Sequence, residues 1–257
     1  MGLRWATTVS NWAGQDCARG SRPTAREPAP RLIRCGPFFS SAATSSSQTH
    51  RSSPMSGEES PALARVDAFA AHVLARAAPL AFGTARSLSE LEAVYRLRCQ
   101  VVLHQGWARP EDFPDCLERD AFDERALHIV AWASGELVGT TRLVAPVPGY
   151  RLPAEQAFDL EIANRGRVID MGRICRAPGR IDAGQRIFRG LLCQSWVELR
   201  SRGFAEICGV FSPAMARFYR RLGFRVEILG EARAHWGEHR YPVLVRPAES
   251  IDTLRWR

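Results

Sequence analysis

One stretch of this 257-residue chain resembles a buried β-strand but carries two opposite charges. It reads Gly-Arg-Val-Ile-Asp-Met-Gly-Arg-Ile-Cys over residues 166–175. Burying an unpaired charge is costly, so Asp170 and Arg173 predict buried partners or a functional site, unless this is an edge strand with solvated charges. Alternation along a strand would place these two side chains on opposite faces, but Gly172 between them predicts a β-bulge that brings both to one face.

The pattern from residue 56 onward alternates between helical and extended segments. Ser87 and Glu90, for example, form a capping box that predicts a helix start, and Gly203 and Gly223 predict helix ends. The order of elements indicates an α+β domain, an α/β sandwich with a mixed central sheet and flanking helices. We expect helices over 61–77, 88–103, 153–158, 184–202 and 213–222, and strands over 80–85, 127–133, 137–144, 167–175, 205–211, 224–229 and 240–246.

The beginning of the chain differs in composition from the rest. It is rich in Ser, Ala, Arg, Pro and Thr, and such a segment cannot bury enough apolar surface to fold. We therefore expect residues 1–55 to be a disordered extension, or to lie upstream of a true start at Met55. An Arg-rich and acid-poor composition also resembles an organellar transit peptide. We expect one domain over 56–250 and a short tail over 251–257.

The net charge of +8 does not indicate a nucleic-acid partner. All 35 basic residues are arginine, which indicates a composition bias, and the first 54 residues carry seven arginines against two acids while the rest carry 28 against 25. No dense basic helix interleaved with aromatic residues appears. The sequence contains no run of 18 apolar residues, so no membrane span is predicted. The chain is therefore expected to act on small molecules or proteins, away from nucleic acid.

Cysteine and histidine usage points away from disulfides and metals. None of the seven cysteines is in CxxC spacing, and most lie in apolar stretches. This pattern favours a reducing compartment, so we expect a cytoplasmic location and no structural zinc. His235 and His239 are four residues apart, but they straddle Gly237 in a turn-like stretch, and we expect no metal site.

Motifs near the C-terminus carry a family resemblance. Residues 218–224 read Phe-Tyr-Arg-Arg-Leu-Gly-Phe, and together with the order of elements they resemble the Gcn5-related N-acyltransferase superfamily. The sequence contains no Walker loop, no GxGxxG at a strand–helix junction and no GxSxG elbow. Nucleotide hydrolysis and dinucleotide binding therefore have no support from motifs. The resemblance implies the fold of that superfamily, with a bulged fourth strand at the centre of the sheet.

A second set of residues narrows the resemblance to one branch of this superfamily. These are, in order, Arg98, Trp107, the Glu118–Asp123 segment, Arg142 within Gly139–Leu143, and the Asp170–Arg173 segment. On these residues the chain, over roughly residues 80–247, is similar to acyl-homoserine-lactone synthases and long-chain N-acyl amino acid synthases. Asp170 stands where those enzymes usually have Glu, and Val102 where they usually have Phe.

This resemblance implies transfer of a fatty-acyl group from an acyl carrier protein thioester to an amine, as in quorum-sensing signal synthesis by acyl-homoserine-lactone synthases. Alternatives are an N-acyl amino acid synthase, a CoA-dependent acetyltransferase, or a non-catalytic binding protein on the same fold. The 180–186 segment fits an acetyl-CoA-binding loop poorly, which favours an acyl-phosphopantetheine donor, either carrier protein or acyl-CoA. S-adenosylmethionine is a possible co-substrate, and no permanently bound cofactor is implied.

Acyl transfer to an amine needs a proton acceptor and donors for the oxyanion. We assign Asp170 as the general base, directly or through water, and Arg173 as the second catalytic residue; backbone N–H groups freed by the bulge supply the oxyanion donors. The alternative role of Asp170 is a buried ion pair with a nearby arginine. Tyr219 is a possible general acid, although such a tyrosine more often packs in the core. The expected substrate-binding residues are Arg98, Trp107, Asp120, Asp123 and Arg142.

Acyl carrier protein is acidic, so its docking surface should be basic. Arg176, Arg180, Arg186 and Arg189 follow the central strand and begin the next helix, near the expected entry of a phosphopantetheine arm. We expect them to form the docking patch. The alternative is an ordinary solvated helix face.

Overall fold

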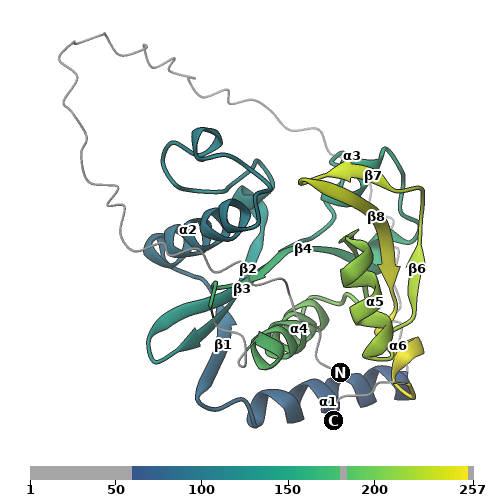
Figure 1. Ribbon diagram of the computed structural model, residues 1–257. Coiled ribbons are helices and arrows are strands. Elements are labelled where there is room, and N and C mark those ends of the chain that lie inside the picture. The colour runs from purple at the N-terminus through teal and green to yellow at the C-terminus, as the bar shows by residue number, and fades with distance from the viewer. Residues whose placement is uncertain (1–59, 180–183, 254–257) are drawn as a thin grey trace, which may run out of the picture. The chain divides into compact units, whose positions relative to one another are not determined.

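The charged strand lies at the centre of an eight-stranded mixed sheet (Figure 1). The computed structural model describes residues 60–179 and 184–253. Within them only the β4–β5 pair is parallel, and the other pairs are antiparallel, which confirms the predicted mixed sheet. The strands are ordered β1 (Leu80–Thr84), β2 (Leu127–Ala133), β3 (Glu136–Val144), β4 (Val168–Arg176), β5 (Glu206–Phe211), β8 (Glu238–Val245) and β6 (Val226–Ile228), with β7 (Arg233–His235) also paired to β8.

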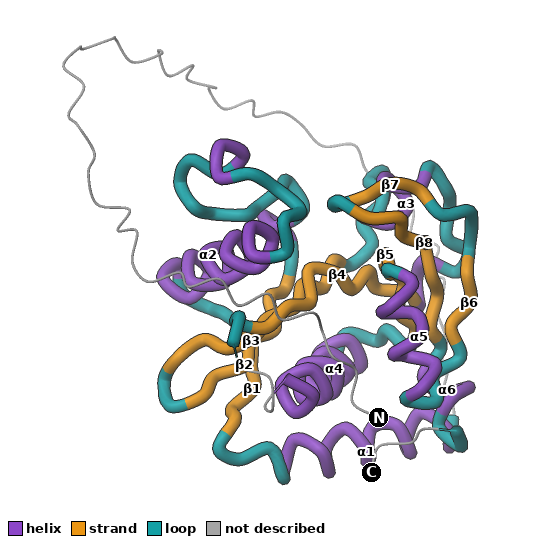
Figure 2. Tube along the Cα trace, viewed as in Figure 1, coloured by secondary structure: helices purple, strands orange, loops and turns teal. Residues whose placement is uncertain are grey.

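Helices cover both faces of this sheet, as Figures 1 and 2 show. The larger core joins one sheet face, which includes Ile169 and Met171, to α1 (Pro61–Ala75), α4 (Gly184–Arg200) and α5 (Pro213–Arg221). The smaller core joins the other face to α3 (Pro153–Phe158). The two remaining helices are α2 (Leu88–His104), which packs against β3 and β4, and the short α6 (Pro247–Ser250).

The helix α1 and the C-terminal residues are tied to the same core. Asp67 accepts hydrogen bonds from Trp196 Nε1 at 2.6 Å and from Arg200 Nε at 3.2 Å. Arg65 pairs with Asp252 at 2.6 Å. No helix of the described residues is long and apolar enough to cross a membrane. The predicted N-terminal extension lies outside the described residues, and the domain boundaries stay a prediction.

The last part of the sheet differs from the sequence prediction. The strand expected over 224–229 is only three residues long, and β7 was not predicted at all. The β7–β8 turn consists of Trp236 and Gly237, with φ of 50° and 71°. The stretch around Gly237 was recognised as turn-like. A bulky residue rarely adopts the left-handed conformation, however, and the usual Asn-Gly or Asp-Gly hairpin signal is missing, so the sequence pattern did not predict a β-hairpin here.

The predicted bulge is present in β4. Two residues of β4, Arg173 and Ile174, face the single residue Thr141 on β3. The bulge lies just after Gly172, and it is Arg173 that takes the left-handed conformation, with φ of 55°. Asp170 contacts α3 and Arg173 contacts the loop after α2, on the same side of the sheet. The bulge therefore brings both charges to one face, as predicted.

The pairing of β4 with β5 is short. It covers only Val168–Asp170 against Glu206–Cys208. Beyond these pairs, in the described residues, β4 continues with β3 and β5 continues with β8. Just after the last pair, β4 and β5 are still close together at Gly209, where an added Cβ atom would lie 2.6 Å from the carbonyl oxygen of Met171. Gly209 thus marks the point at which the two central strands part.

Replacing Gly209 with Ala should therefore destabilise the protein. The added methyl group meets a backbone oxygen, so β4 or β5 must shift, at a cost of about 1–3 kcal/mol. Gly83→Ala in β1 is the matched control, because a Cβ there meets nothing within 4 Å. Urea unfolding should show a lower midpoint for Gly209→Ala alone. Equal midpoints would mean that the close approach is not a constraint.

Candidate functional site

Six charged side chains form a closed ring beside the bulge. Every arginine in it bonds two carboxylates, and every carboxylate bonds two arginines. We call this arrangement the ionic ring. It runs through Arg98, Glu118, Arg173, Asp120, Arg142 and Asp123, and back to Arg98.

The contacts around the ring are those of charge-assisted hydrogen bonds. Both terminal nitrogens of Arg98 bind Asp123, at 2.8 and 3.1 Å, and its Nε binds Glu118. Arg173 donates to Glu118 at 3.0 Å and to Asp120 at 2.9 Å. The ring closes through Arg142 Nη1, which donates to Asp120 at 2.6 Å and to Asp123 at 3.0 Å.

The ring joins four separate segments of the chain. Arg98 comes from α2, Arg142 from β3, Arg173 from the β4 bulge, and the carboxylates from the loop 105–126. The loop has little regular structure of its own, so these bonds hold it to the sheet. The sequence predictions that Asp120 and Asp123 partner the strand arginines, and that Arg98 has a buried partner, are confirmed.

Only one side of the ring reaches solvent. The side chain of Asp120 is 31 % exposed and that of Arg173 is 20 % exposed. Those of Arg98, Glu118 and Arg142 are only 2 % exposed, and that of Asp123 is 4 % exposed. A small ligand can therefore meet the ring only at Asp120 and Arg173.

The buried ring members keep their charges. Burial alone would lower the pKa of Arg98, but hydrogen bonds and charges of Asp123 and Glu118 outweigh it, and that pKa is raised. Burial alone would raise the pKa of Asp123, yet Arg98 and Arg142 hold it well below its usual range. Arg98 and Asp123 therefore stay charged, and the three arginines of the ring match its three carboxylates in number.

His128 lies next to the ring and was missed by sequence analysis. Its Nε2 is 3.7 Å from Asp123, and its ring packs edge-on against Tyr95. Burial, with the charges of Arg98 and Arg142, lowers the pKa of His128 to about 4 despite Asp123. His128 is therefore neutral at physiological pH.

An aromatic side chain covers Arg173, the arginine of the ionic ring that is partly exposed. The Arg173 guanidinium lies 4.6 Å from the centre of the Trp236 ring, at the tip of the β7–β8 turn. Trp107 packs against Gly237, where an added Cβ would lie 2.8 Å from its Cδ1 atom, and the Arg240 guanidinium lies 4.7 Å from the centre of the Trp107 ring. The turn thus connects Trp107 to Arg173. Trp236 and Arg240 were not among the predicted site residues.

Asp170 lies on the same face but belongs to a different set of contacts. Its Oδ2 accepts a hydrogen bond from the backbone N–H of Ala154 in α3 at 2.8 Å and lies 3.7 Å from the Cys208 sulfur. Among the described residues no arginine forms an ion pair with it. Burial raises the pKa of Asp170 to about 6, although the Ala154 N–H and the charge of Arg142 oppose the shift.

Sequence reasoning listed five of the six ring members and omitted Glu118. Its motif was recognised, but Glu118 was counted with Asp112, Asp115 and Glu124 as part of an acidic loop that could simply be solvated. Glu118 turns out to be as buried as any side chain in the ring. Spacing along a loop does not reveal which of several carboxylates turns inward.

The other predicted residues are not members of the ring. Tyr219 is buried among aromatic side chains, 4.5 Å from Phe211, and burial raises its pKa. Arg186 donates to the carbonyl oxygens of Ala77 and Ala78, at 3.1 and 2.7 Å. Arg176 and Arg189 are half-buried, and Arg180 lies outside the described residues.

Solved structures with the same fold include two kinds of synthase. TofI, solved in a ternary complex with an inhibitor and MTA, has 20% identity and a TM-score of 0.54, covering 67% of this chain and 96% of that one. FeeM, an N-acyl amino acid synthase from uncultured soil microbes, has 18% identity and a TM-score of 0.52, covering 68% and 94%. BjaI, a CoA-dependent acyl-homoserine lactone synthase solved with SAM and isopentyl-CoA, has 19% identity and a TM-score of 0.50, covering 63% and 78%. The fold is thus that of Gcn5-related acyltransferases, as predicted.

A family comparison identifies the chain more closely. The family model described as N-acyl amino acid synthase FeeM matches residues 93–245, which include the whole ionic ring and Asp170. The chain therefore belongs to the FeeM N-acyl amino acid synthase family, and it is an acyltransferase that acts on an amine. A search of curated proteins gave no match.

Breaking the ring should cost far more than breaking a surface pair. Glu118→Gln leaves Arg98 and Arg173 each without one charged partner in a buried place, and should cost about 3–5 kcal/mol. Glu92→Gln removes an exposed partner of Arg96 and should cost less than about 1 kcal/mol. Urea unfolding of both variants measures the difference. Similar values for the two would mean that the ring contributes no more than surface pairs.

Proposed function

We propose that this enzyme transfers a fatty-acyl group from a phosphopantetheine thioester to the amine of an amino acid. The observation that carries the proposal is the position of the ionic ring: its exposed edge, Asp120 and Arg173, adjoins the bulge of β4 beside the place where β4 and β5 part. A zwitterionic acceptor suits this edge, since Asp120 can bind an ammonium group and Arg173 a carboxylate.

In this proposal the thioester binds where β4 and β5 part. After the bulge, β4 has no ladder partner on its β5 side within the described residues, so its backbone N–H groups there are available to an oxyanion. Strands that part also leave room for a pantetheine arm. The donor would then approach the ring from the β5 side, and the acceptor from the loop side.

The reaction needs one base and one leaving group. The acceptor ammonium gives a proton to Asp170 through water, and the neutral amine attacks the thioester carbon. The C–N bond forms and the C–S bond breaks, and the second nitrogen proton ends on the leaving thiolate. Asp170 is suited to this because its pKa of about 6 lies near the operating pH.

Two related activities differ in the acceptor that they use. Family membership favours an open acyl amino acid over the lactone that would be made from S-adenosylmethionine, the reverse of the order expected from sequence motifs. Mass spectrometry of the product formed by purified enzyme separates the two. If the product is a lactone, the function is quorum-sensing signal synthesis instead. If no acyl product forms from any donor, the proposed function is wrong.

The cysteines are compatible with reaction in the cytoplasm. Cys99, Cys116, Cys175, Cys193 and Cys208 are all free thiols in the described part of the chain. Free thiols are typical of a reducing compartment. We therefore place the reaction in the cytoplasm.

Asp170→Asn tests the base. An Asn can still accept the Ala154 hydrogen bond, so the fold should be retained, but product formation should fall at least about 100-fold. The wild-type rate should drop below pH 6 as Asp170 is protonated, and this dependence should vanish in the variant. Asp159→Asn, at an exposed carboxylate just after α3, is the control and should keep wild-type activity.

Unfolding measurements add a check on the same variant. The pKa of Asp170 is raised in the folded state, so its ionisation costs stability as the pH rises from about 4 through 6. Asp170→Asn should therefore gain stability relative to the wild type over this range. Undiminished product formation in Asp170→Asn would mean that Asp170 only anchors α3.

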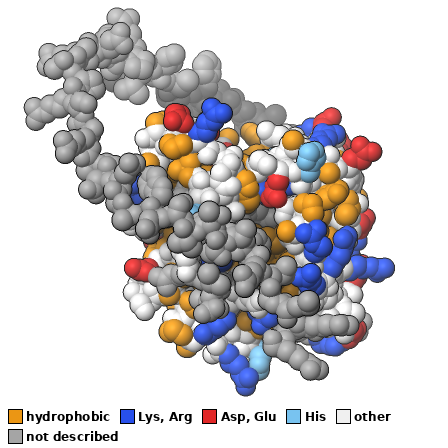
Figure 3. Space-filling view, viewed as in Figure 1, with side chains coloured by type: hydrophobic (Ala, Val, Ile, Leu, Met, Phe, Trp, Pro, Cys, Tyr) orange, Lys and Arg blue, Asp and Glu red, His pale blue; other side chains and the backbone are white. Residues whose placement is uncertain are grey.

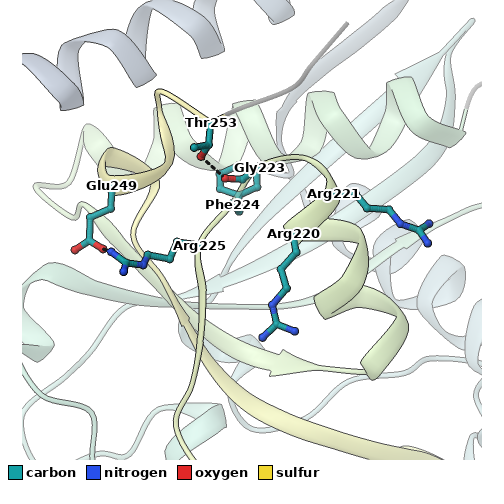
Figure 4. A pocket seen from close by; sticks show the side chains of 7 residues that line it. All are labelled: Arg220, Arg221, Gly223, Phe224, Arg225, Glu249 and Thr253. Carbon is teal, nitrogen blue, oxygen red and sulfur yellow. Dashed lines mark hydrogen bonds and ion pairs between the residues drawn. The ribbon is translucent and has the colours of Figure 1, made fainter.

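Two basic surfaces compete for the carrier protein. One includes Arg186, an exposed residue at the start of α4. The other borders an open pocket of about 590 Å³ at the end of α5, and basic side chains gather on that side of the molecule in Figure 3. In Figure 4 the side chains of Arg220, Arg221 and Arg225 point in different directions, and Arg225 turns to Glu249. We place docking at Arg186, because α4 follows the bulged strand directly.

Charge reversal distinguishes these surfaces. Arg186→Glu should raise the KM for acyl carrier protein several-fold, more at low salt, and leave the KM for acyl-CoA unchanged. Arg186→Gln controls for loss of the bonds to Ala77 and Ala78, and Arg221→Glu tests the rival surface. A raised KM in Arg221→Glu alone would move the docking site to α5. If the KM for acyl carrier protein is unchanged in all of these variants, the carrier protein is not the partner and CoA is favoured as the donor.

A further inference from the structure

Cys208 is a buried thiol beside Asp170 that the proposed reaction does not use. It lies on β5 directly opposite Asp170, in the last pair of the short parallel ladder between β4 and β5. Its side chain is fully buried in the smaller core. The sulfur is 3.7 Å from Asp170 Oδ2, which is within reach of an S–H···O hydrogen bond donated by the thiol. The thiol and the carboxylate therefore form a direct contact between the two central strands.

Cys208 keeps its proton in this contact. Burial and the neighbouring charge of Asp170 raise the pKa of the thiol well above its usual range, and the charge of Glu155 in α3 adds to the effect. Since the thiolate is the nucleophilic form of cysteine, this sulfur does not take up an acyl group itself. Cys208 therefore acts on Asp170 as a hydrogen-bond donor.

Both donors to Asp170 act on the same carboxylate oxygen. Oδ2 accepts the Ala154 N–H at 2.8 Å as well as the Cys208 S–H, whereas Oδ1 has no hydrogen-bond partner among the described residues. Oδ1 lies toward Gly172, where an added Cβ would be 3.7 Å from it. The oxygen without a partner therefore faces the bulge, close to the place where β4 and β5 part.

The two donors come from separate elements that are each fixed in place. The helix α3, which carries Ala154, is anchored by Glu155. That carboxylate accepts hydrogen bonds from the backbone N–H groups of Leu152 and Ile162, at 2.8 and 3.0 Å, and pairs with an arginine at 3.1 Å. The other donor lies on β5, which at this point is paired with β4 on one side and β8 on the other. The carboxylate of Asp170 is therefore held from two directions.

We propose that Cys208 is a positioning residue for the base. Together with Ala154 it holds Oδ2 of Asp170, so that Oδ1 is the atom that takes the proton of the acceptor ammonium through water. The inference rests on the proposed function, which supplies that ammonium. Two donors on Oδ2 restrict rotation of the side chain, which keeps Oδ1 directed at the bulge.

Cys208 is the contact of Asp170 that can be removed by itself. Burial raises the pKa of Asp170, whereas the Ala154 N–H opposes the shift. The charges of Arg142 and Arg173 oppose it as well, as does the thiol. Both arginines belong to the ionic ring, and the N–H belongs to the backbone, so their removal would disturb more than Asp170. The thiol can be replaced while the ring and α3 keep all of their bonds.

Substitution of the thiol tests the contact. Cys208→Ala removes the donor and should raise the pKa of Asp170 from about 6 by about 0.5, because the lost bond favoured the charged carboxylate. NMR of the carboxyl carbon against pH measures this, and Asp170→Asn assigns the signal. Cys208→Ser keeps a donor on the same carbon and should hold the pKa at the wild-type value or below it. Cys193→Ala, which removes a buried thiol from the larger core, is the matched control and should leave the pKa unchanged.

The rate of product formation gives a second measurement. Less of Asp170 is ionised at a given pH in Cys208→Ala, so well below pH 6 its kcat should fall about 3-fold relative to the wild type. The KM for the acceptor should stay the same, and Cys208→Ser should restore the kcat. A thiol that only fills space would change stability without moving the pH profile.

The two measurements separate this inference from the proposed function. If the pKa of Asp170 rises in Cys208→Ala while no acyl product forms from any donor, the proposed function fails and the contact of Cys208 with Asp170 holds. If the pKa is unchanged or lowered in Cys208→Ala, although thermal unfolding shows the variant folded, Cys208 only fills the core and the inference is wrong.

Discussion

The closed ring of six charges is the interaction on which the site depends. A single buried ion pair seldom stabilises a fold, because desolvation offsets the attraction between the charges. Here each charge has two neighbours of opposite sign, and the ring reaches solvent only at Asp120 and Arg173. The ring holds α2, the loop after it, β3 and β4 in one arrangement. Removing any member leaves two charges short of a partner, so the segments are held together or released together.

The bulge in β4 owes its shape to this ring. Arg173 has a φ of 55°, which is unfavourable for a residue with a Cβ. Its side chain is held at one edge by Glu118 and Asp120 and covered on its face by Trp236. These contacts compensate for the strained backbone. They also keep Arg173 on the face of Asp170, which regular alternation along β4 would not allow.

The sequence predicted much of this arrangement and missed specific parts of it. Opposite charges in an apolar strand are costly enough to predict partners, and the glycine beside them predicted the bulge. The turn-like stretch around Gly237 was recognised, but the hairpin that it forms between β7 and β8 was missed. A tryptophan in the left-handed conformation contradicts local preference, and Trp236 and Gly237 are held by Arg173 and Trp107, which are distant in sequence.

The two aspartates nearest the bulge show how one fold gives similar groups different chemistry. Asp123 lies inside the ring, where Arg98 and Arg142 hold its pKa well below the usual range, so it stays charged and serves structure. Asp170 lies on the same face without an ion-pair partner in the described residues, and burial raises its pKa to about 6. A carboxylate that exchanges protons near neutral pH must stand outside the ring. The ring therefore favours Asp170 as the base, because each of the three carboxylates in the ring is already bonded to two arginines.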